Sequence, residues 1–406
     1  MKIDPAKHGW LSEPETYAVM QALGEARFVG GAVRNALLGA AVIDIDIAVP
    51  VPPQESIALL EAAGIKTVPT GLDHGTITAI KNGKVFEVTS LRRDIATDGR
   101  HAVVAYTRDW SEDSARRDFT INALYAGADG EIFDYHGGIE DLIAGRVRFV
   151  GEPHARISED YLRILRLFRF HAWYGRGDMD AEALRAAAEG RAGLKQLSGE
   201  RIAKEMLRLL ECPNPAPALR VMAASAILSE ILPFALQWPR LEQMIQLDAD
   251  NFFAPDPILR LGALLPDDLA AARAVAERLR FSTVDRERLE DLAGGGAQAL
   301  SHLPARDIRR VLYELGVSAF TDQVRLGWAN ASPGTNAIPW RVLLSVAATF
   351  EKPRFPLTGR DVMALGVPEG PRVGKILSAV EDWWIDQDFP DDGLIDKLKE
   401  TLRSPE

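Results

Sequence analysis

The sequence has one cysteine, Cys212, among its 406 residues. A single cysteine excludes an internal disulfide and argues against a zinc site built from thiolates. No uninterrupted apolar run reaches the length that spans a membrane, and the N-terminal stretch MKIDPAKHGWLSEPE lacks the apolar core of a signal peptide. We therefore expect a cytoplasmic protein in a reducing compartment, with no membrane contact and no implied protein partner.

Positive charge is also scarce, since 47 Lys and Arg stand against 58 Asp and Glu, a formal net charge of -11. This balance argues against loose, charge-driven binding to nucleic acid. It still permits a specific RNA site if the basic residues gather on one face. The chain is 47% hydrophobic and 26% charged, as in ordinary globular proteins, and is long enough for more than one domain.

The hydrophobic pattern changes along the chain. Up to about residue 150, short strand patterns alternate with helix patterns, and Asn82-Gly83 between two apolar runs predicts a β-hairpin. Farther on, helical periodicity dominates. We predict an α+β fold with the following parts: a head with an antiparallel or mixed sheet (1–150), then a helical neck (151–211), a helical body (212–335) and a helical tail (336–406).

Some local elements are predicted more narrowly. One helix is expected over 111–127, a strand over 146–150, and one helix over 158–175 with Ser158 as its N-cap. The polar stretch 92–110 shows no clear period.

Two aspartates, Asp44 and Asp46, stand one residue apart in AVIDIDIAV, a period-2 pattern typical of a strand. On a strand both carboxylates point to one face, where they repel each other and favour a hard cation such as Mg²⁺. A solvated edge strand and the D-x-D of a sugar-nucleotide transferase are the alternatives to such a metal site.

A double glycine, Gly30-Gly31, lies upstream, between a strand pattern and a short helix pattern that carries Arg34. Glycines let backbone approach a phosphate closely, amides at a helix start favour anions, and an arginine can clamp a triphosphate. A Gly-Gly pair alone is more often a tight turn. Followed by a strand carrying D-x-D, it predicts a nucleotide site.

Together these motifs resemble the nucleotidyltransferase superfamily of DNA polymerase β type, and more narrowly class II CCA-adding enzymes and bacterial poly(A) polymerases. VGGAVRNALLG, DIDIAV, FEVTSLR, RRDFTINAL, YHGGIEDL, EDYLRILRLFRF and SGERIAKE follow in the family's order over most of residues 27–211. One departure is Asn35, where the family usually has aspartate.

The resemblance implies template-independent addition of CCA to the 3′ end of the tRNA acceptor arm from CTP and ATP, with release of pyrophosphate. Two Mg²⁺ ions held by Asp44 and Asp46 would activate the tRNA hydroxyl and stabilise the leaving oxygen. Glu87 is either a third carboxylate beside this pair or an exposed strand residue. The implied nucleotide-binding residues are Gly30, Gly31, Arg34, Arg117, Asp118, Asp160, Arg163, Arg166 and Arg169. Arg116 is expected on a solvated helix face.

The segment EDYLRILRLFRF places Asp160 and Arg163 on one face of the expected helix. A carboxylate accepts and a guanidinium donates hydrogen bonds, which matches the pairing edges of cytosine and adenine and mismatches those of uracil and guanine. The resemblance assigns base selection to this pair, and an ordinary surface ion pair is the alternative. Glu159 either orients Arg163 or favours the helix start.

The C-terminal segment LTGRDVMALGVPEGPRVGKIL resembles the tail of CCA-adding enzymes, where Arg372 and Lys375 would meet tRNA phosphates. The chain lacks the long basic extension typical of poly(A) polymerases, and its polar stretch around 98–101 matches a flexible loop that CC-adding enzymes lack. We therefore expect full CCA addition. Poly(A) addition, addition of CC or A alone, and a non-catalytic nucleotide-binding module are the alternatives.

Overall fold

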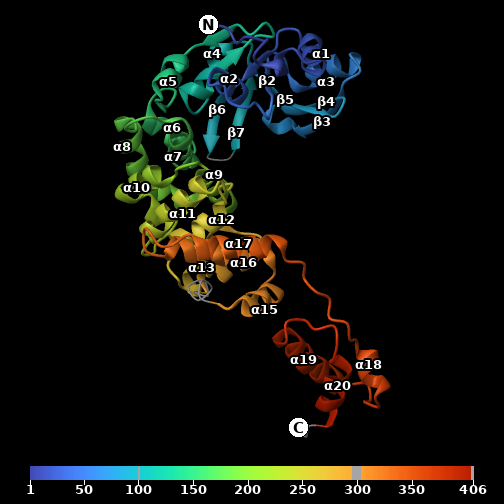
Figure 1. Ribbon diagram of the computed structural model, residues 1–406. Helices are drawn as coiled ribbons and strands as arrows, with labels where there is room; N and C mark the ends of the chain where they lie inside the picture. Colours follow the sequence, from blue (N-terminus) through green and yellow to red (C-terminus); the bar gives the residue numbers. More distant parts are fainter. Residues whose placement is uncertain (99–100, 295–302, 404–406) are drawn as a thin grey trace. The chain divides into compact units, whose positions relative to one another are not determined.

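The computed structural model describes residues 1–98, 101–294 and 303–403. It divides into two compact units, Met1–Pro233 and Phe234–Glu406 (Figure 1). All strands of the described residues lie in the first unit, and the described part of the second is built from helices. The division of the chain into head, neck, body and tail stays a prediction. Among the described helices, none combines the length and the apolar character needed to cross a membrane.

A seven-stranded sheet organises the first unit, in the order β3-β4-β5-β2-β1-β8-β9. β2 and β5 run parallel, and the other neighbours are antiparallel. Its strands are β1 (Arg27–Val29), β2 (Asp46–Val49), β3 (Lys66–Gly71), β4 (Thr76–Lys81), β5 (Lys84–Ser90), β8 (Leu124–Ala126) and β9 (Ile132–Asp134). A separate hairpin pairs β6 (Arg92–Asp98) with β7 (His101–Tyr106). The predicted α+β fold with a mixed sheet is thereby confirmed.

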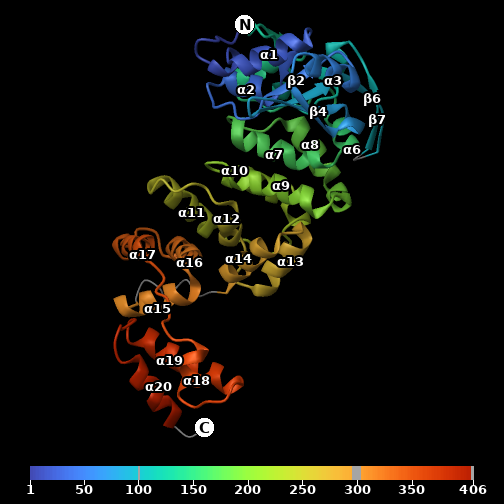
Figure 2. The same ribbon diagram turned by 90° about the vertical axis from the view of Figure 1, so that its right-hand side faces the viewer.

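The helices of the two units are numbered in chain order. Those of the first unit are α1 (Pro14–Leu23), α2 (Gly31–Leu37), α3 (Pro53–Ala62), α4 (Trp110–Ala115), α5 (Gly138–Ala144), α6 (Pro153–Glu159), α7 (Leu162–Tyr174), α8 (Ala181–Gly190), α9 (Gly199–Leu210) and α10 (Ala216–Ala224). Those of the second are α11 (Trp238–Asp250), α12 (Pro257–Leu264), α13 (Leu269–Leu279), α14 (Thr283–Ala293), α15 (Ala305–Leu315), α16 (Val317–Asn330), α17 (Ile338–Thr349), α18 (Gly359–Ala364), α19 (Pro371–Asp386) and α20 (Leu394–Arg403). Figure 2 shows the same elements from the side.

β2 is the central strand of the sheet, and most of its residues are buried. Its residues Ile47, Ala48 and Val49 are all buried, and Ala48 packs in a cluster with Leu91 and Tyr125. The strand is therefore held rigidly by its neighbours, so that the residue with which it begins, Asp46, has a fixed position.

The hairpin predicted at Asn82-Gly83 is confirmed, and it joins β4 to β5. Both residues have positive φ, 49° and 84°, as a two-residue turn of type I′ requires. This local geometry fixes the register of β4 against β5. The separate parallel pairing of β5 with β2 sets Glu87 beside Asp46.

Between residues 92 and 127, one hairpin was missed and one helix prediction failed. The stretch 92–110 contains β6 and β7, which sequence reasoning missed because an irregularity between Asp94 and Ala96 interrupts the period of two. The helix predicted over 111–127 ends at Ala115. The chain then turns and enters the sheet as β8, whose three residues are buried.

Two further predictions failed between residues 146 and 175. The stretch 146–150 is not a strand but makes one isolated bridge, between Phe119 and Phe149. The single helix predicted over 158–175 is two helices, α6 and α7, because Asp160 between them has extended backbone, with φ -157° and ψ 107°. Ser158 consequently lies inside α6 and caps nothing, whereas the predicted stop at Gly175 is confirmed.

The second unit has its own buried core near its C-terminal end. Trp384 of α19 packs with Val362 of α18, Leu398 of α20 and Tyr313 of α15. The Trp384 indole N–H donates to the carbonyl of Pro390 at 2.9 Å, so its polar atom is satisfied.

Candidate active site

A pocket of about 400 Å³ opens in the first unit. It is lined by residues from the end of β1, helix α2, the segment before β2 with the first residue of that strand, the connection from α4 to β8, and helices α7 and α9. The lining residues are Gly30, Gly31, Arg34, Asn35, Ile43, Asp44, Asp46, Arg117, Asp118, Asn122, Arg166, Arg169, Phe170 and Arg208. The structure thus brings together most of the residues that the sequence singled out.

Several of the singled-out residues lie elsewhere. Glu87, Asp160 and Arg163 belong to the first unit but do not line the pocket. Arg372 and Lys375 lie in the second unit, in the first turns of α19, where a helix start was expected. The stretch around 98–101 includes two residues, 99 and 100, that lie outside the described residues, so the expected flexible loop stays a prediction.

The glycine turn has the conformation that its sequence suggests. Gly30 has a φ of 67°, which favours glycine, and it precedes α2. A Cβ at this position would lie 3.7 Å from the Asn122 carbonyl oxygen and 3.9 Å from Nη1 of Arg117. The missing side chain therefore keeps the floor of the pocket open beside an arginine.

Arg34 is buried and already well paired. Its guanidinium donates to the Asn122 side-chain oxygen at 2.5 Å, to the Asn35 side-chain oxygen at 3.0 Å, and to the Tyr174 hydroxyl at 2.8 Å. Burial lowers the pKa of Arg34. Because the Asn35 amide accepts this bond without adding a negative charge, the positive charge of Arg34 is left to the pocket.

The two aspartates do not share a strand. β2 begins at Asp46, and Asp44 lies in a bend before it, next to Ile43, which is 88% exposed. The prediction of one strand reaching both is wrong, because ladder pairing of β2 starts only at Asp46. Both carboxylates nevertheless line the same pocket.

Asp46 carries an unusual charge environment. Its burial, followed by the nearby carboxylates of Glu87 and Asp44, raises its pKa to about 6, with Arg117 opposing the shift. Glu87 is the exact register partner of Asp46 on the parallel strand β5. The carboxylates of Glu87 and Asp44 therefore leave the negative charge of Asp46 poorly compensated, and a bound cation would relieve this repulsion.

A buried carboxylate, Asp113, anchors the arginine doublet. It accepts from Arg116 at 2.7 Å, from Arg117 at 3.1 Å and from the Tyr125 hydroxyl at 2.6 Å. Burial works to raise the pKa of Asp113, but the two arginines outweigh it and lower the pKa to about 2. Arg116 is only 16% exposed, so its expected place on a solvated helix face is wrong.

Arg117 is held so that it faces the pocket. Its Nε donates to the Tyr125 hydroxyl at 3.1 Å, and its Nη1 lies by the glycine turn. Its neighbour Asp118 accepts from Arg166 Nε at 2.8 Å, from the Asn122 amide at 3.0 Å and from the backbone N–H of Phe119 at 2.8 Å. Burial works to raise the pKa of Asp118, but Arg166 and the other hydrogen-bond donors stabilise its charge and lower the pKa to about 2.

Glu205 of α9 positions the arginines of α7. This carboxylate is buried and accepts from Arg169 Nε at 2.5 Å, and it lies 3.6 Å from Nη1 of Arg166. Sequence reasoning missed Glu205, although it lies inside SGERIAKE, because its partners are on another helix.

We expect Glu205→Gln to lower the free energy of unfolding by about 3 kcal/mol, since it leaves buried guanidinium charge without its counterion. Denaturant titration measures the change. The control is Glu211→Gln, an exposed carboxylate at the end of the same helix, which should shift stability by no more than about 0.5 kcal/mol. Equal effects of the two substitutions would contradict this role of Glu205.

The side chains of the proposed base-reading residues, Asp160 and Arg163, are each paired with other residues, while the Arg163 backbone N–H donates to the Asp160 carbonyl oxygen at 3.0 Å. Asp160 accepts from the Leu162 backbone N–H at 3.1 Å and from Arg201 of α9 at 2.7 Å. Arg163 donates to Glu159 and to the Arg156 carbonyl oxygen, the latter at 2.7 Å. The ion pair with Glu159 agrees with the interpretation that this carboxylate orients Arg163.

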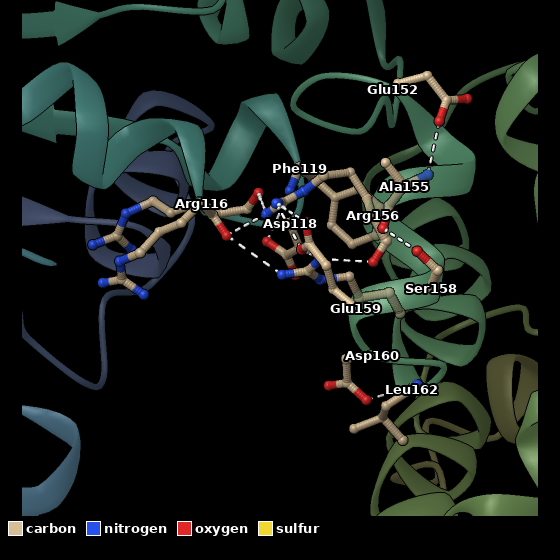
Figure 3. A network of polar contacts seen from close by, with 12 residues as sticks. Arg116, Asp118, Phe119, Glu152, Ala155, Arg156, Ser158, Glu159, Asp160 and Leu162 are labelled. Carbon is tan, nitrogen blue, oxygen red and sulfur yellow. Dashed lines mark hydrogen bonds and ion pairs between the residues drawn. The ribbon is translucent and has the colours of Figure 1, made fainter. Parts of the chain in front are cut away.

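Arg156 ties this segment to the head. From α6 it donates to the carbonyl oxygens of Arg116 and Arg117, the second at 2.8 Å (Figure 3). Its Nη1 also donates to Glu159 at 2.9 Å. A network of hydrogen bonds therefore connects the arginine doublet beside the pocket with the residues before α7.

The mixed sheet, the glycine turn and the paired carboxylates define a nucleotidyltransferase. Residues 26–148 match the poly(A) polymerase head domain, and residues 178–238 match the probable RNA- and SrmB-binding site of polymerase A. The mitochondrial CCA tRNA nucleotidyltransferase 1 of Danio rerio is 34% identical over 374 residues, covering 89% of this chain and 83% of that protein. The CCA-adding enzyme of Streptococcus gordonii is 30% identical over 378 residues, covering 91% of each.

A solved structure agrees with these relatives. The Bacillus stearothermophilus CCA-adding enzyme in complex with CTP matches with a TM-score of 0.74 at 26% identity, covering 96% of this chain and 98% of that one. The chain belongs to the family of CCA-adding tRNA nucleotidyltransferases, as its motifs predicted.

Proposed function

We propose that this protein adds CCA to the 3′ end of tRNA, using CTP and ATP and releasing pyrophosphate. The observation that carries the proposal is the pocket, where a glycine turn, two aspartates and the arginines Arg34, Arg117, Arg166, Arg169 and Arg208 converge. Relatives named for this activity align with most of the chain, which favours CCA addition over poly(A) addition.

Asp44 and Asp46 would hold Mg²⁺ in the pocket. The fit is supported by the raised pKa of Asp46, because burial and two neighbouring carboxylates leave its charge poorly compensated. Within the described residues no three acidic, histidine or cysteine side chains gather as a metal site. Two carboxylates with water and phosphate oxygens are a usual ligand set for Mg²⁺, so Glu87 would tune Asp46 rather than act as a ligand. When two ions are bound, they lower the pKa of the tRNA hydroxyl and stabilise the leaving oxygen.

The residues of the chain would position the nucleotide for attack by the tRNA 3′ oxygen on its α-phosphate. Backbone at Gly30 and Gly31 approaches the phosphates, and Arg117 directs Nη1 toward them. Asp118 holds Arg166 at the wall of the pocket. Such fixed donors stabilise the negative charge that develops on the leaving pyrophosphate, and the donors need not reorganise in the transition state.

Base selection would fall to Asp160 and Arg163. Glu159 and Arg201 fix these two side chains, so that one acceptor and one donor group stand ready for a base edge. Cytosine and adenine satisfy both groups, whereas uracil and guanine leave them unpaired. The pair lies outside the pocket lining, which leaves the pocket to the phosphates.

The tail would bind tRNA through Arg372 and Lys375 at the start of α19. Recognition by phosphate contacts and shape is compatible with the net charge of -11, since a few basic residues on one side suffice. Placement in the cytoplasm stays a prediction, since relatives include proteins named as mitochondrial.

Catalysis is tested with tRNA that lacks its last three nucleotides, CTP, ATP and Mg²⁺. We expect pyrophosphate release that requires both the RNA and the metal, and that stops when the metal is chelated. A protein that binds CTP but releases no pyrophosphate would be a non-catalytic nucleotide-binding module instead.

A further inference from the structure

Arg208 lines the nucleotide pocket, but unlike the other pocket arginines its side chain enters none of the contacts described above. It lies near the end of α9 and is exposed. Within the described part of the chain, no hydrogen bond or ion pair engages its guanidinium. The other pocket arginines of the two packed helices, Arg166 and Arg169, are both paired with carboxylates. Arg208 therefore differs from them in having all its donors available.

Arg208 belongs to one face of α9 that complements α7. Arg201, Glu205 and Arg208 follow at spacings of four and three, so they share a face of the helix. The first pairs with Asp160 and the second with Arg169. Charges along this face are thus paired with side chains on or just before α7 until Arg208, for which the described residues show no ion pair.

The position along α7 shows which end of the pocket Arg208 serves. Asp160 lies just before the start of α7, and Tyr174 lies at its end. The Tyr174 hydroxyl accepts from Arg34 of α2, and the neighbouring Trp173 indole donates to the Arg208 carbonyl oxygen at 2.9 Å. Arg208 therefore stands at the end of α7 that meets the helix after the glycine turn, away from the base-reading end.

We propose that Arg208 binds the triphosphate of the incoming nucleotide. A guanidinium forms strong charge-assisted hydrogen bonds to phosphoryl oxygens, and an unpaired one does so without breaking a protein contact. Arg34, Arg166 and Arg169 would have to give up partners to do the same. The proposal rests on the proposed function, since it takes a nucleoside triphosphate as the ligand.

The test compares wild-type protein with Arg208→Gln, Arg208→Lys and Lys204→Gln in the absence of RNA. Lys204 is exposed on the same helix and does not line the pocket, so its substitution removes an equal charge as a control. Calorimetric titration gives the dissociation constants of CTP and CMP. We expect Arg208→Gln to weaken CTP about tenfold or more and CMP hardly at all. Arg208→Lys should restore part of the loss, and Lys204→Gln should match wild type.

Three results would overturn the inference: unchanged CTP binding by Arg208→Gln, an equal loss for CMP, or weakened binding of tRNA alone, which would place an RNA phosphate at Arg208. Because Arg208 is exposed, thermal unfolding of the variant should equal that of wild type, which separates binding from folding. Failure of the Arg208 inference can be told apart from failure of the proposed function. If the proposed function were wrong, the wild-type protein itself would incorporate no CMP into truncated tRNA.

Discussion

Asp46→Asn should abolish nucleotide incorporation and at the same time stabilise the folded protein. The substitution removes a carboxylate proposed to hold Mg²⁺, and we expect incorporation of CMP to fall by roughly a thousandfold or more, the loss of several kcal/mol of charge stabilisation. It also removes a half-buried charge that is repelled by Glu87 and Asp44. At pH 7.5 without metal, the free energy of unfolding should rise by roughly 2 to 3 kcal/mol.

The pH dependence gives the sign of the stability effect. Burial first, then Glu87 and Asp44, raises the pKa of Asp46 from 3.8 to about 6 in the folded protein. Between these values the folded chain binds more protons than the unfolded chain, so wild-type stability falls as the pH rises through this window. The advantage of Asp46→Asn should be small at pH 4 and complete above pH 6. Denaturant titrations at several pH values in chelator measure it.

Asp44→Asn is the matched comparison. Asp44 lines the same pocket but is exposed, so its substitution should impair incorporation with little change in stability. Retained incorporation by Asp46→Asn would contradict its role at the metal. A loss of stability in place of a gain would contradict the charge environment described for it.

Asp160→Asn should weaken the preference for CTP over UTP by about 10- to 100-fold. The asparagine amide offers a donor where the carboxylate only accepts, so it can pair with the uracil carbonyl and remove one of the two mismatches, which is worth roughly 1 to 3 kcal/mol. Competition between CTP and UTP on truncated tRNA measures the ratio.

A full exchange of charges between Asp160 and Arg163 is a poorer test. Asp160→Arg would place a second guanidinium against Arg201, and Arg163→Asp would place a second carboxylate against Glu159. The control for Asp160→Asn is Asp178→Asn, an exposed carboxylate that does not line the pocket, which should leave the ratio unchanged. A ratio unchanged by Asp160→Asn would show that the bases are read elsewhere.

Local patterns predicted the parts of the fold that depend on neighbouring residues. Asn82-Gly83 formed its hairpin because two left-handed residues suffice for that turn. The helix over 111–127 failed because burial of Leu124 and Tyr125 in the sheet outweighs helical propensity. At the interruption, the Asp160 carboxylate accepts both from the Leu162 backbone N–H and from Arg201, and the second partner lies far along the chain.

In the candidate site, too, the sequence predicted local features but not the contacts between distant segments. Sequence motifs located the glycine turn, Asp44, Asp46 and the arginine row, because the chemistry of these residue types can be recognised without the structure. The motifs did not show that the Arg34 guanidinium donates hydrogen bonds to Asn35, Asn122 and Tyr174. Contacts between helices distant in sequence decide which arginines are paired, and periodicity on one helix carries no information about its partner.

The most direct measurement is the sequence of the 3′ ends after incubation of the protein with truncated tRNA, Mg²⁺, CTP and ATP. We predict that the product ends in CCA and that growth then stops. With CTP alone the product should end in CC. A long tract of adenosines would contradict the proposed function and indicate a poly(A) polymerase, and an unextended tRNA would exclude nucleotidyl transfer to this substrate.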